Sequence, residues 1–369
     1  MTAYLLPIIA FLLSIACGFI FIPLILNFCK EKRLYDIPNS RKIHSSAVPR
    51  LGGICFLPSM LIALVITTFA VNGFTGYEQV TFSLWSLYFF VSLLLIYGVG
   101  LVDDLIGLNA THKFTVQIIA AALMPLSGLF MNNLYGFLGI YELPYAIGSV
   151  MTVFVIVFTC NAINLIDGID GLSASLSFIA LSGFLYCFFR EDIYSYAILI
   201  AGLMGVLVPF LYFNLFGSAE KNRKIFMGDS GSLTLGFILG FLTVKASMHN
   251  PNVMPFHRDS LMLSYTLTLV PVFDVVRVIL VRTFHRRPLF SADKNHIHHK
   301  LMRAGLTQHQ TLLVIIALSL FYIVFNYILF HYCYLSVLVA VDIVVWMMFH
   351  YVVNIRIRKN GLKPFQTEE

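Results

Sequence analysis

Charged residues are scarce in this sequence. Only 11% of its 369 residues are Asp, Glu, Lys or Arg, while 59% are hydrophobic. A soluble domain of this length would need many more charged side chains on its surface. The composition therefore excludes a large soluble domain and predicts an integral membrane protein.

Two further absences narrow the class. The six cysteines lie mostly in apolar segments and form no Cys-x-x-Cys pair, which argues against a disulfide framework and against a zinc site. No internal repeat is evident, and this argues against a transporter built from two duplicated halves. The net charge of +6 is concentrated in the loops, where membrane topology explains it, so we expect no binding of nucleic acid.

What the sequence does contain is a series of apolar stretches long enough to cross about 30 Å of hydrocarbon. We expect an all-α polytopic membrane protein with eleven transmembrane helices, folded as a single domain over residues 1–369. The first stretch lacks a basic leader and an obvious cleavage site, so we expect it to be retained. The expected spans are 3–29, 51–71, 82–102, 114–131, 145–163, 171–189, 194–214, 232–248, 261–281, 311–330 and 333–353.

Lysine and arginine indicate the orientation, because basic loops stay in the cytoplasm. One side of the membrane collects nearly all of the basic loop residues, while the other side has Arg190 and Arg258. We therefore expect the N-terminus outside and the C-terminus inside. The expected cytoplasmic segments are the loops 30–50, 103–113, 162–172, 215–231 and 282–310, and the basic tail 354–369.

The acidic motifs all fall on this cytoplasmic side. An ionised carboxylate at a bilayer centre costs about 2.5–3.5 kcal/mol on insertion scales, so such groups are expected at span ends or on a metal. Asp103 and Asp104 close the third span, and adjacent carboxylates repel unless a cation lies beside them. Mg²⁺ suits such a pair together with substrate phosphate oxygens, and Lys113 follows nine residues later. A solvated helix end is the simpler alternative explanation.

Two more motifs carry acids. Asn164, Asp167 and Asp170 are spaced by three, which places them on one face of a helix, although Asp170 would also suit a helix N-terminus. Asp229 lies between glycines and hydroxyls just before the eighth span. Such a loop can direct backbone N–H groups at an anion while its acid holds a metal.

Two loops are rich in hydrogen-bond donors. Either loop could bind phosphate, and the first would equally be explained as an ordinary basic cytoplasmic loop. In the last loop, phosphate contact is favoured over zinc because no cysteine or matched acid accompanies the histidines. The donors are Arg41, Lys42, His44 and Arg50 in the first loop, and Arg286, His296, His298 and His299 in the last.

Together these segments resemble the polyprenyl-phosphate N-acetylhexosamine-1-phosphate transferase family over nearly the whole chain. The resemblance implies transfer of sugar-1-phosphate from a UDP-N-acetylhexosamine to undecaprenyl phosphate, with release of UMP, at the cytoplasmic face of a bacterial inner membrane. It also implies Mg²⁺, with Mn²⁺ as the alternative ion, and contact with membrane lipids, and it leaves a homodimer open. It is carried by residues 36–44, 49–53, 103–113, 161–172, 226–232 and 296–299.

The resemblance also implies roles for single residues. Asp229 would be the firmest metal ligand, joined by Asp103 and Asp104. Asp103, Asp104, Asp167 and Asp170 would be catalytic, and Lys113, Asn164, Asn214 and the donors named above would bind substrate. Two departures stand out: Gly107 and Asn109 follow the aspartate pair without a third acid, and the stretch from Phe216 to Lys224 leaves the reach of Asn214 in doubt.

The His-Ile-His-His pattern resembles the N-acetylglucosamine branch, so we expect N-acetylglucosamine-1-phosphate as the transferred group and the start of a lipid-linked cell-surface glycan. A phospho-N-acetylmuramoyl-pentapeptide transferase is the alternative within the family. From a different class, a cation- or proton-coupled transporter would place acids near span centres, whereas here they lie at span ends.

Overall fold

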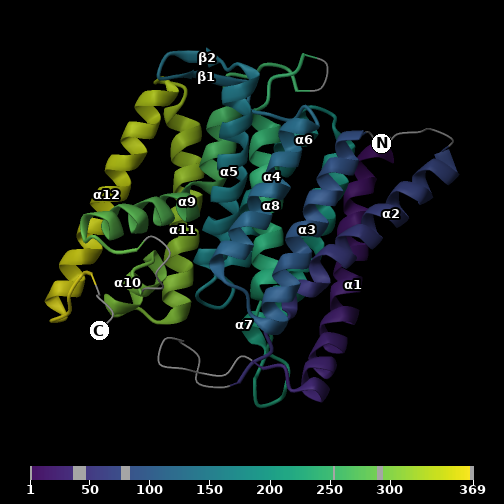
Figure 1. Ribbon diagram of the computed structural model, residues 1–369, viewed down its shortest axis with the longest axis horizontal. Helices are drawn as coiled ribbons and strands as arrows, with labels where there is room; N and C mark the ends of the chain where they lie inside the picture. Colours follow the sequence, from purple (N-terminus) through teal and green to yellow (C-terminus); the bar gives the residue numbers. More distant parts are fainter. Residues whose placement is uncertain (1, 36–46, 76–83, 252–253, 289–293, 366–369) are drawn as a thin grey trace.

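The computed structural model describes residues 2–35, 47–75, 84–251, 254–288 and 294–365, and within this part the chain is almost entirely helical. Figure 1 shows long helices standing side by side, with the two termini toward opposite ends of the bundle. The helices are α1 (Thr2–Lys32), α2 (Phe56–Thr75), α3 (Leu84–Ile106), α4 (Ala110–Leu126), α5 (Tyr145–Ile166), α6 (Leu172–Arg190), α7 (Tyr194–Phe216), α8 (Gly228–Ser247), α9 (Ser260–Phe284), α10 (Ile297–Arg303), α11 (Gln308–Leu329) and α12 (Leu335–Lys359), with a 3₁₀ turn η1 (Gly52–Cys55).

Nine helices of the described part are long and apolar enough to cross a membrane. Each of the eleven expected spans corresponds to a helix, but two of these helices, α4 and α9, are outside the nine. Helix α4 has only 17 residues and ends at Leu126, before the expected end at 131. Helix α9 contains Pro271, and Figure 1 shows that it turns aside part-way along its length. A proline removes one helical hydrogen bond, which explains such a bend.

A short hairpin is the exception to the all-α expectation. Strand β1 (Asn133–Phe137) pairs antiparallel with β2 (Ile140–Glu142) between α4 and α5. The hairpin covers one end of the bundle in Figure 1, the end at which the N-terminus lies. Gly136 and Gly139, both at positive φ, help to turn the chain in this hairpin.

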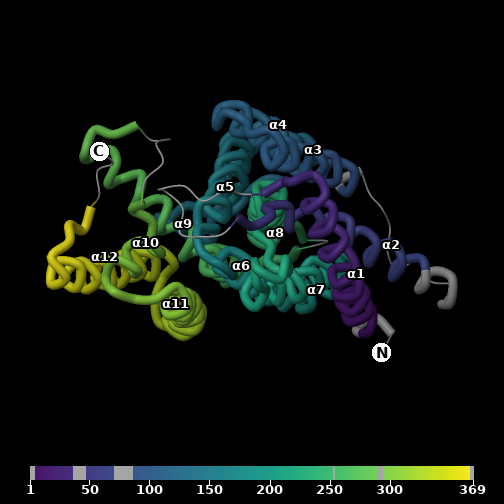
Figure 2. The backbone as a smooth tube through the Cα atoms, turned by 90° about the horizontal axis from the view of Figure 1, so that it is seen from below, coloured from purple at the N-terminus to yellow at the C-terminus, as the bar shows by residue number. Residues whose placement is uncertain are grey.

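Helix α8 is the centre of the fold. It is surrounded by α3, α5, α6 and α9, and every residue from Ser230 to Ser247 is buried. Figure 2 shows it inside the larger group of helices, α1–α8, while α9–α12 form a smaller group beside them. Gly236 and Gly240 permit close packing, because an added Cβ would lie 2.7 Å from Cys160 Cα and 2.9 Å from Ile156 Cα on α5. Because α8 is fixed in this way, its first residues are held rigidly against their neighbours.

Candidate active site

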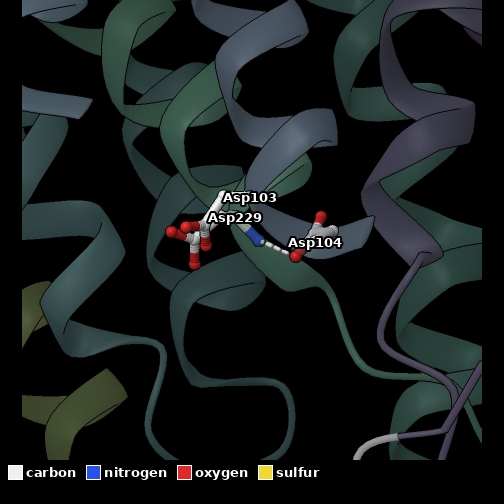
Figure 3. A group of neighbouring side chains, drawn as sticks. All are labelled: Asp103, Asp104 and Asp229. Atoms are coloured by element: carbon white, nitrogen blue, oxygen red, sulfur yellow. Dashed lines mark hydrogen bonds between the residues drawn. The ribbon is translucent and has the colours of Figure 1, made fainter. Parts of the chain in front are cut away.

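Three aspartates meet where α3 ends and α8 begins. Asp103 and Asp104 lie in the last turn of α3 and Asp229 in the first turn of α8. One carboxylate oxygen from each residue lies within 4.8 Å of those from the other two. Figure 3 shows the carboxylates of Asp103 and Asp229 side by side, while Asp104 points away from them. The three predicted metal ligands therefore come together in one acidic cluster (Asp103, Asp104 and Asp229), in which Asp104 is oriented differently from the other two.

A lysine from the next helix, α4, bridges Asp103 and Asp229. Lys113 Nζ lies 2.7 Å from Asp229 Oδ2 and 3.3 Å from Asp103 Oδ2. Asp103 Oδ1 accepts the backbone N–H of Leu108 at 2.7 Å, which orients its carboxylate toward the lysine. An ammonium group thus lies between Asp103 and Asp229 and offsets part of their negative charge.

Asp104 has a different set of partners. Its two oxygens accept the backbone N–H groups of Asp229 and Ser230, at 2.8 and 2.9 Å. These groups belong to the first turn of α8, where backbone donors have no partner within the helix. Asp104 therefore caps α8 from a neighbouring helix and fixes the position of Asp229.

Arg50 secures the other side of this junction. Its guanidinium group donates to the backbone carbonyl oxygen of Asp104 at 2.9 Å and to that of Asp103 at 3.3 Å. It therefore satisfies carbonyl groups at the C-terminal end of α3. The backbone of Arg50 also packs closely on Gly228, the first residue of α8: Gly228 lies at φ +75, and an added Cβ would meet the Arg50 carbonyl oxygen at 2.1 Å. Of the predicted substrate-binding residues of the first loop, Arg50 thus supports the acidic cluster, while Arg41, Lys42 and His44 lie outside the described residues.

One member of the predicted polar face, Asn164, contacts the cluster, and a second, Asp167, is close enough for the charges of the cluster to affect its pKa. Asn164 Nδ2 donates to Asp229 Oδ1 at 3.2 Å and to Ser232 Oγ at 2.8 Å. Asp167 lies half-buried in the turn after α5. Burial and the nearby charges of Asp229, Asp170 and Asp104 raise the pKa of Asp167 to about 8. Asp167 is thus mostly protonated at neutral pH when no further cation is bound.

Asp170 and Asn214 have partners of their own. Asp170 Oδ2 forms an ion pair with Lys224 Nζ at 2.6 Å. The buried Asn214 accepts from Gly171 N at 2.6 Å and donates to the carbonyl oxygen of Ile225 at 2.8 Å. Both side chains therefore tie the turn after α5 to the loop before α8, and the predicted substrate role of Asn214 stays a prediction.

The histidine motif lies against the same turn. The ring of His298 is buried and packs on Gly168, where an added Cβ would meet its Nε2 at 2.1 Å. Burial, followed by the neighbouring His299 and His296, lowers the pKa of His298 well below its usual range, so the ring is neutral. The rings of His298 and His299 lie 4.2 Å apart. A loop more than 120 residues away in sequence is thus brought beside Asp167.

Arg286 is placed differently from the other donors. It follows the end of α9 with φ 53 and is exposed to solvent. Among the described residues, no ion pair joins it to the acidic cluster. Its predicted contact with substrate stays a prediction.

Sequence reasoning missed one residue of this region. Asp274 on α9 is fully buried and accepts from Ile297 N at 3.0 Å, while its Oδ2 lies 2.8 Å from His296 Nδ1. The available signal was an acid inside an apolar run with Arg277 three residues later, a spacing that suits an ion pair on one helix. It was overlooked because it lies inside an expected span rather than in a loop.

The oxygen donors of the cluster suit a divalent cation. Mg²⁺ binds one or two carboxylates together with substrate phosphate oxygens, and Asp103 and Asp229 offer such a pair beside the amide of Asn164. The position of Lys113 Nζ shows that positive charge is stable there. Asp104 is within reach, but both of its oxygens already accept N–H groups. The residues therefore fit a metal held mainly by Asp103 and Asp229.

Comparison with known proteins agrees with this geometry. The sequence pattern of glycosyl transferase family 4 matches residues 85–247, the segment that contains all three aspartates of the cluster. The chain is 29% identical over 320 residues to a probable undecaprenyl-phosphate N-acetylglucosaminyl 1-phosphate transferase of Bacillus subtilis, covering 84% of this chain and 80% of the relative. It is 29% identical over 284 residues to an undecaprenyl-phosphate alpha-N-acetylglucosaminyl 1-phosphate transferase of Yersinia pestis, covering 76% of this chain and 73% of the relative.

A third relative has a slightly higher percentage identity. The decaprenyl-phosphate N-acetylglucosaminephosphotransferase of Mycobacterium tuberculosis is 31% identical over 296 residues, which is 75% of this chain and 71% of the relative. The resemblance read from the motifs is thereby confirmed. With its acidic cluster on the matched segment and its similarity spread over three quarters of its length, the chain belongs to glycosyl transferase family 4, the family of the polyprenyl-phosphate N-acetylhexosamine-1-phosphate transferases.

Proposed function

We propose that this protein transfers N-acetylglucosamine-1-phosphate from UDP-N-acetylglucosamine to undecaprenyl phosphate, releases UMP and so begins a lipid-linked cell-surface glycan. The observation that carries the proposal is that Asp103 and Asp229 face each other at the ends of two apolar helices, with the ammonium group of Lys113 between them. Such a pair suits a metal-bound diphosphate next to a lipid phosphate. The names of the three relatives support the choice of sugar and acceptor.

Asp103 and Asp229 would hold Mg²⁺, or Mn²⁺ in its place. A divalent cation bound there would reduce the negative charge on the diphosphate of the donor. Lys113 already contacts both acids and would move its ammonium group to a phosphate oxygen once the cation is bound. His296 and His299 would donate to the remaining phosphate oxygens.

The transfer itself needs little acid or base help. An oxygen of the lipid phosphate attacks the β-phosphorus of the donor, the bond from that phosphorus to the bridging oxygen breaks, and UMP leaves with the bonding electrons. A phosphate monoester has a second pKa of about 6, so the acceptor is largely dianionic at neutral pH. The pKa of Asp167 is raised to about 8 when no further cation is bound, and in its protonated form this residue would act as a hydrogen-bond donor to a phosphate oxygen.

The location of the chemistry follows from the same reasoning. The basic loops on one side of the bundle point to the cytoplasm, and the acidic cluster is built from helix ends on that side. We therefore place the active site at the cytoplasmic face of the inner membrane, where nucleotide sugars are available.

Purified protein incubated with undecaprenyl phosphate and labelled UDP-sugars tests the proposal. We expect lipid-linked label from UDP-N-acetylglucosamine with Mg²⁺, and none after chelation. Asp229→Asn is the matched inactive control. Transfer only from UDP-N-acetylmuramoyl-pentapeptide would assign the chain to the other branch of the family. Cation-dependent uptake into vesicles without transfer would instead support a transporter.

A further inference from the structure

A buried ion pair contacts the histidine motif, apart from the cluster of Asp103, Asp104 and Asp229. Asp274 on α9 is 0% exposed and forms an ion pair with Arg277, with 2.8 Å between Asp274 Oδ1 and Arg277 Nη2. Its other oxygen lies 2.8 Å from His296 Nδ1. We propose that Asp274, held by Arg277, is a positioning residue that fixes the ring orientation of His296 for phosphate binding. The inference rests on the proposed transferase function.

The carboxylate decides which ring nitrogen faces away. A histidine that donates from Nδ1 to a carboxylate keeps Nε2 for another partner, and such support from behind usually fixes both the tautomer and the ring plane. Rotating the His296 ring by half a turn would replace the Nδ1–H with a C–H group and break the contact. His296 can thus present only its Nε2 to a phosphate oxygen while Asp274 is in place, and it donates there when Nε2 carries a proton as well as Nδ1.

The same group also fixes the backbone of the motif. Asp274 Oδ1 accepts the N–H of Ile297, the first residue of α10, at 3.0 Å. Arg277 donates in addition to the carbonyl oxygen of Asn295. Three consecutive residues, 295 to 297, are therefore tied to α9 by side chains from two of its positions.

These contacts connect α9 to the turn after α5. His298 follows two residues after His296 and packs on Gly168, which is next to Asp167. The distance between the histidine motif and the turn after α5 is therefore defined only if the start of α10 is fixed. Arg277 stabilises the Asp274 carboxylate that fixes it, because a buried carboxylate without a paired cation would be strongly disfavoured.

A double-mutant cycle separates positioning from general support of the fold. The Asp274 carboxylate has two oxygens that face Arg277, His296 and Ile297. Asp274→Asn keeps the shape of the side chain but leaves one acceptor oxygen, so the contact with His296 is weakened. We expect kcat/KM for the UDP-sugar to fall about 10–100-fold, as for other partners that orient a histidine from behind. In a His296→Ala background the same substitution should cost less than about threefold, because its target is already gone.

The matched control is Asp342→Asn. Asp342 on α12 is also a fully buried acid of the smaller helix group, and it accepts from Tyr265 at 2.8 Å and from Asn326 at 2.9 Å. It has no contact with the histidine motif among the described residues, so kcat/KM should be unchanged. Equal losses from Asp274→Asn in both backgrounds, or no loss in either, would overturn the proposal.

A second readout does not depend on activity. In ¹⁵N-histidine-labelled protein, the His296 signals are identified by their absence from the His296→Ala spectrum. We expect a protonated Nδ1 in the unmodified chain, and a changed Nδ1 signal in Asp274→Asn but not in Asp342→Asn. If the spectrum changes as expected while no UDP-sugar is used, the proposed function fails and the positioning of His296 stands. An unchanged His296 signal in Asp274→Asn would refute the positioning itself.

Discussion

At the scale of single residues, carboxylates that are neighbours in sequence have separate tasks. Asp103 and Asp229 face each other across Lys113, while Asp104 accepts two N–H groups from the first turn of α8. The sequence could indicate that an acidic pair closes α3, but it could not tell the two acids apart, because a one-residue step on a helix turns a side chain by about 100°. Only the position of α8 gives them different partners.

Asp229 is expected to be indispensable. Asp229→Asn removes one anionic ligand, so turnover should fall by far more than tenfold, a loss above about 1.4 kcal/mol in transition-state stabilisation. Raising the UDP-sugar concentration should not restore it. Ser247→Ala, at the other end of the same helix, is the control and should keep full activity. A folded Asp229→Asn protein that retains more than about a tenth of the activity would contradict the assignment.

Asp103 and Asp104 should give different defects. Asp104→Ala leaves two N–H groups of α8 without an acceptor, so we expect a loss of about 1–2 kcal/mol in stability, as for other helix caps. Asp103→Ala should leave the melting temperature nearly unchanged but raise the Mg²⁺ concentration needed for half-maximal activity. Thermal unfolding in detergent and Mg²⁺ titration of activity measure the two effects. Equal melting temperatures for both variants would show that Asp104 is not a cap.

Asp167 predicts a particular dependence of stability on pH. Its pKa is raised to about 8 in the folded state, so between about pH 4 and pH 8 the folded state binds more protons than the unfolded state. Stability from this residue is therefore lost as the pH rises through that range, and Asp167→Asn removes the loss. Without divalent cations, the melting temperature of Asp167→Asn relative to the unmodified protein should rise from pH 5 to pH 8 and then level off. Parallel profiles would contradict the raised pKa.

At the scale of helices, the site depends on how closely α3 approaches α8. An added Cβ at Gly100 would lie 2.6 Å from Ser230 Cα and 2.7 Å from Asp229 O, whereas at Gly98 nothing lies within 4 Å. Gly100→Ala should therefore push the two helices apart, lower stability by about 1–3 kcal/mol and reduce activity strongly. Gly98→Ala, in the same helix, should be nearly neutral in both measurements. Similar effects of the two substitutions would show that the separation of α3 and α8 is not critical.

Most helices could be predicted, because long apolar runs with polar ends have few alternatives in a membrane. The hairpin β1–β2 could not, since its strands have only five and three residues and β pairing depends on contacts outside each strand. Asp274 was missed for a related reason. Its meaning depends on His296, which comes from a separate loop and is brought to it only by the fold.

At the scale of the whole molecule, the proposed function requires the two ends of the bundle to face different compartments. The hairpin residue Tyr141 is 58% exposed at one end, and Glu220 is exposed in the loop before α8 at the other. In a cysteine-free background, a cysteine at Tyr141 should react with an impermeant thiol reagent added to intact cells, and a cysteine at Glu220 should react only after the cells are opened. The reverse pattern would place the acidic cluster outside the cell and remove its access to nucleotide sugars.

The identity of the transferred group is the central point at this scale. A sugar-1-phosphate transferase moves the β-phosphorus of its donor to the lipid, whereas a transferase that moves the sugar alone leaves it on the nucleotide. The measurement is therefore made with UDP-N-acetylglucosamine labelled with ³²P at the β-phosphate, incubated with purified protein, Mg²⁺ and undecaprenyl phosphate. We predict that ³²P enters the lipid fraction together with the sugar in equal amounts, and that unlabelled UMP is released. Recovery of the label in UDP, with sugar but no ³²P in the lipid, would contradict the proposed reaction.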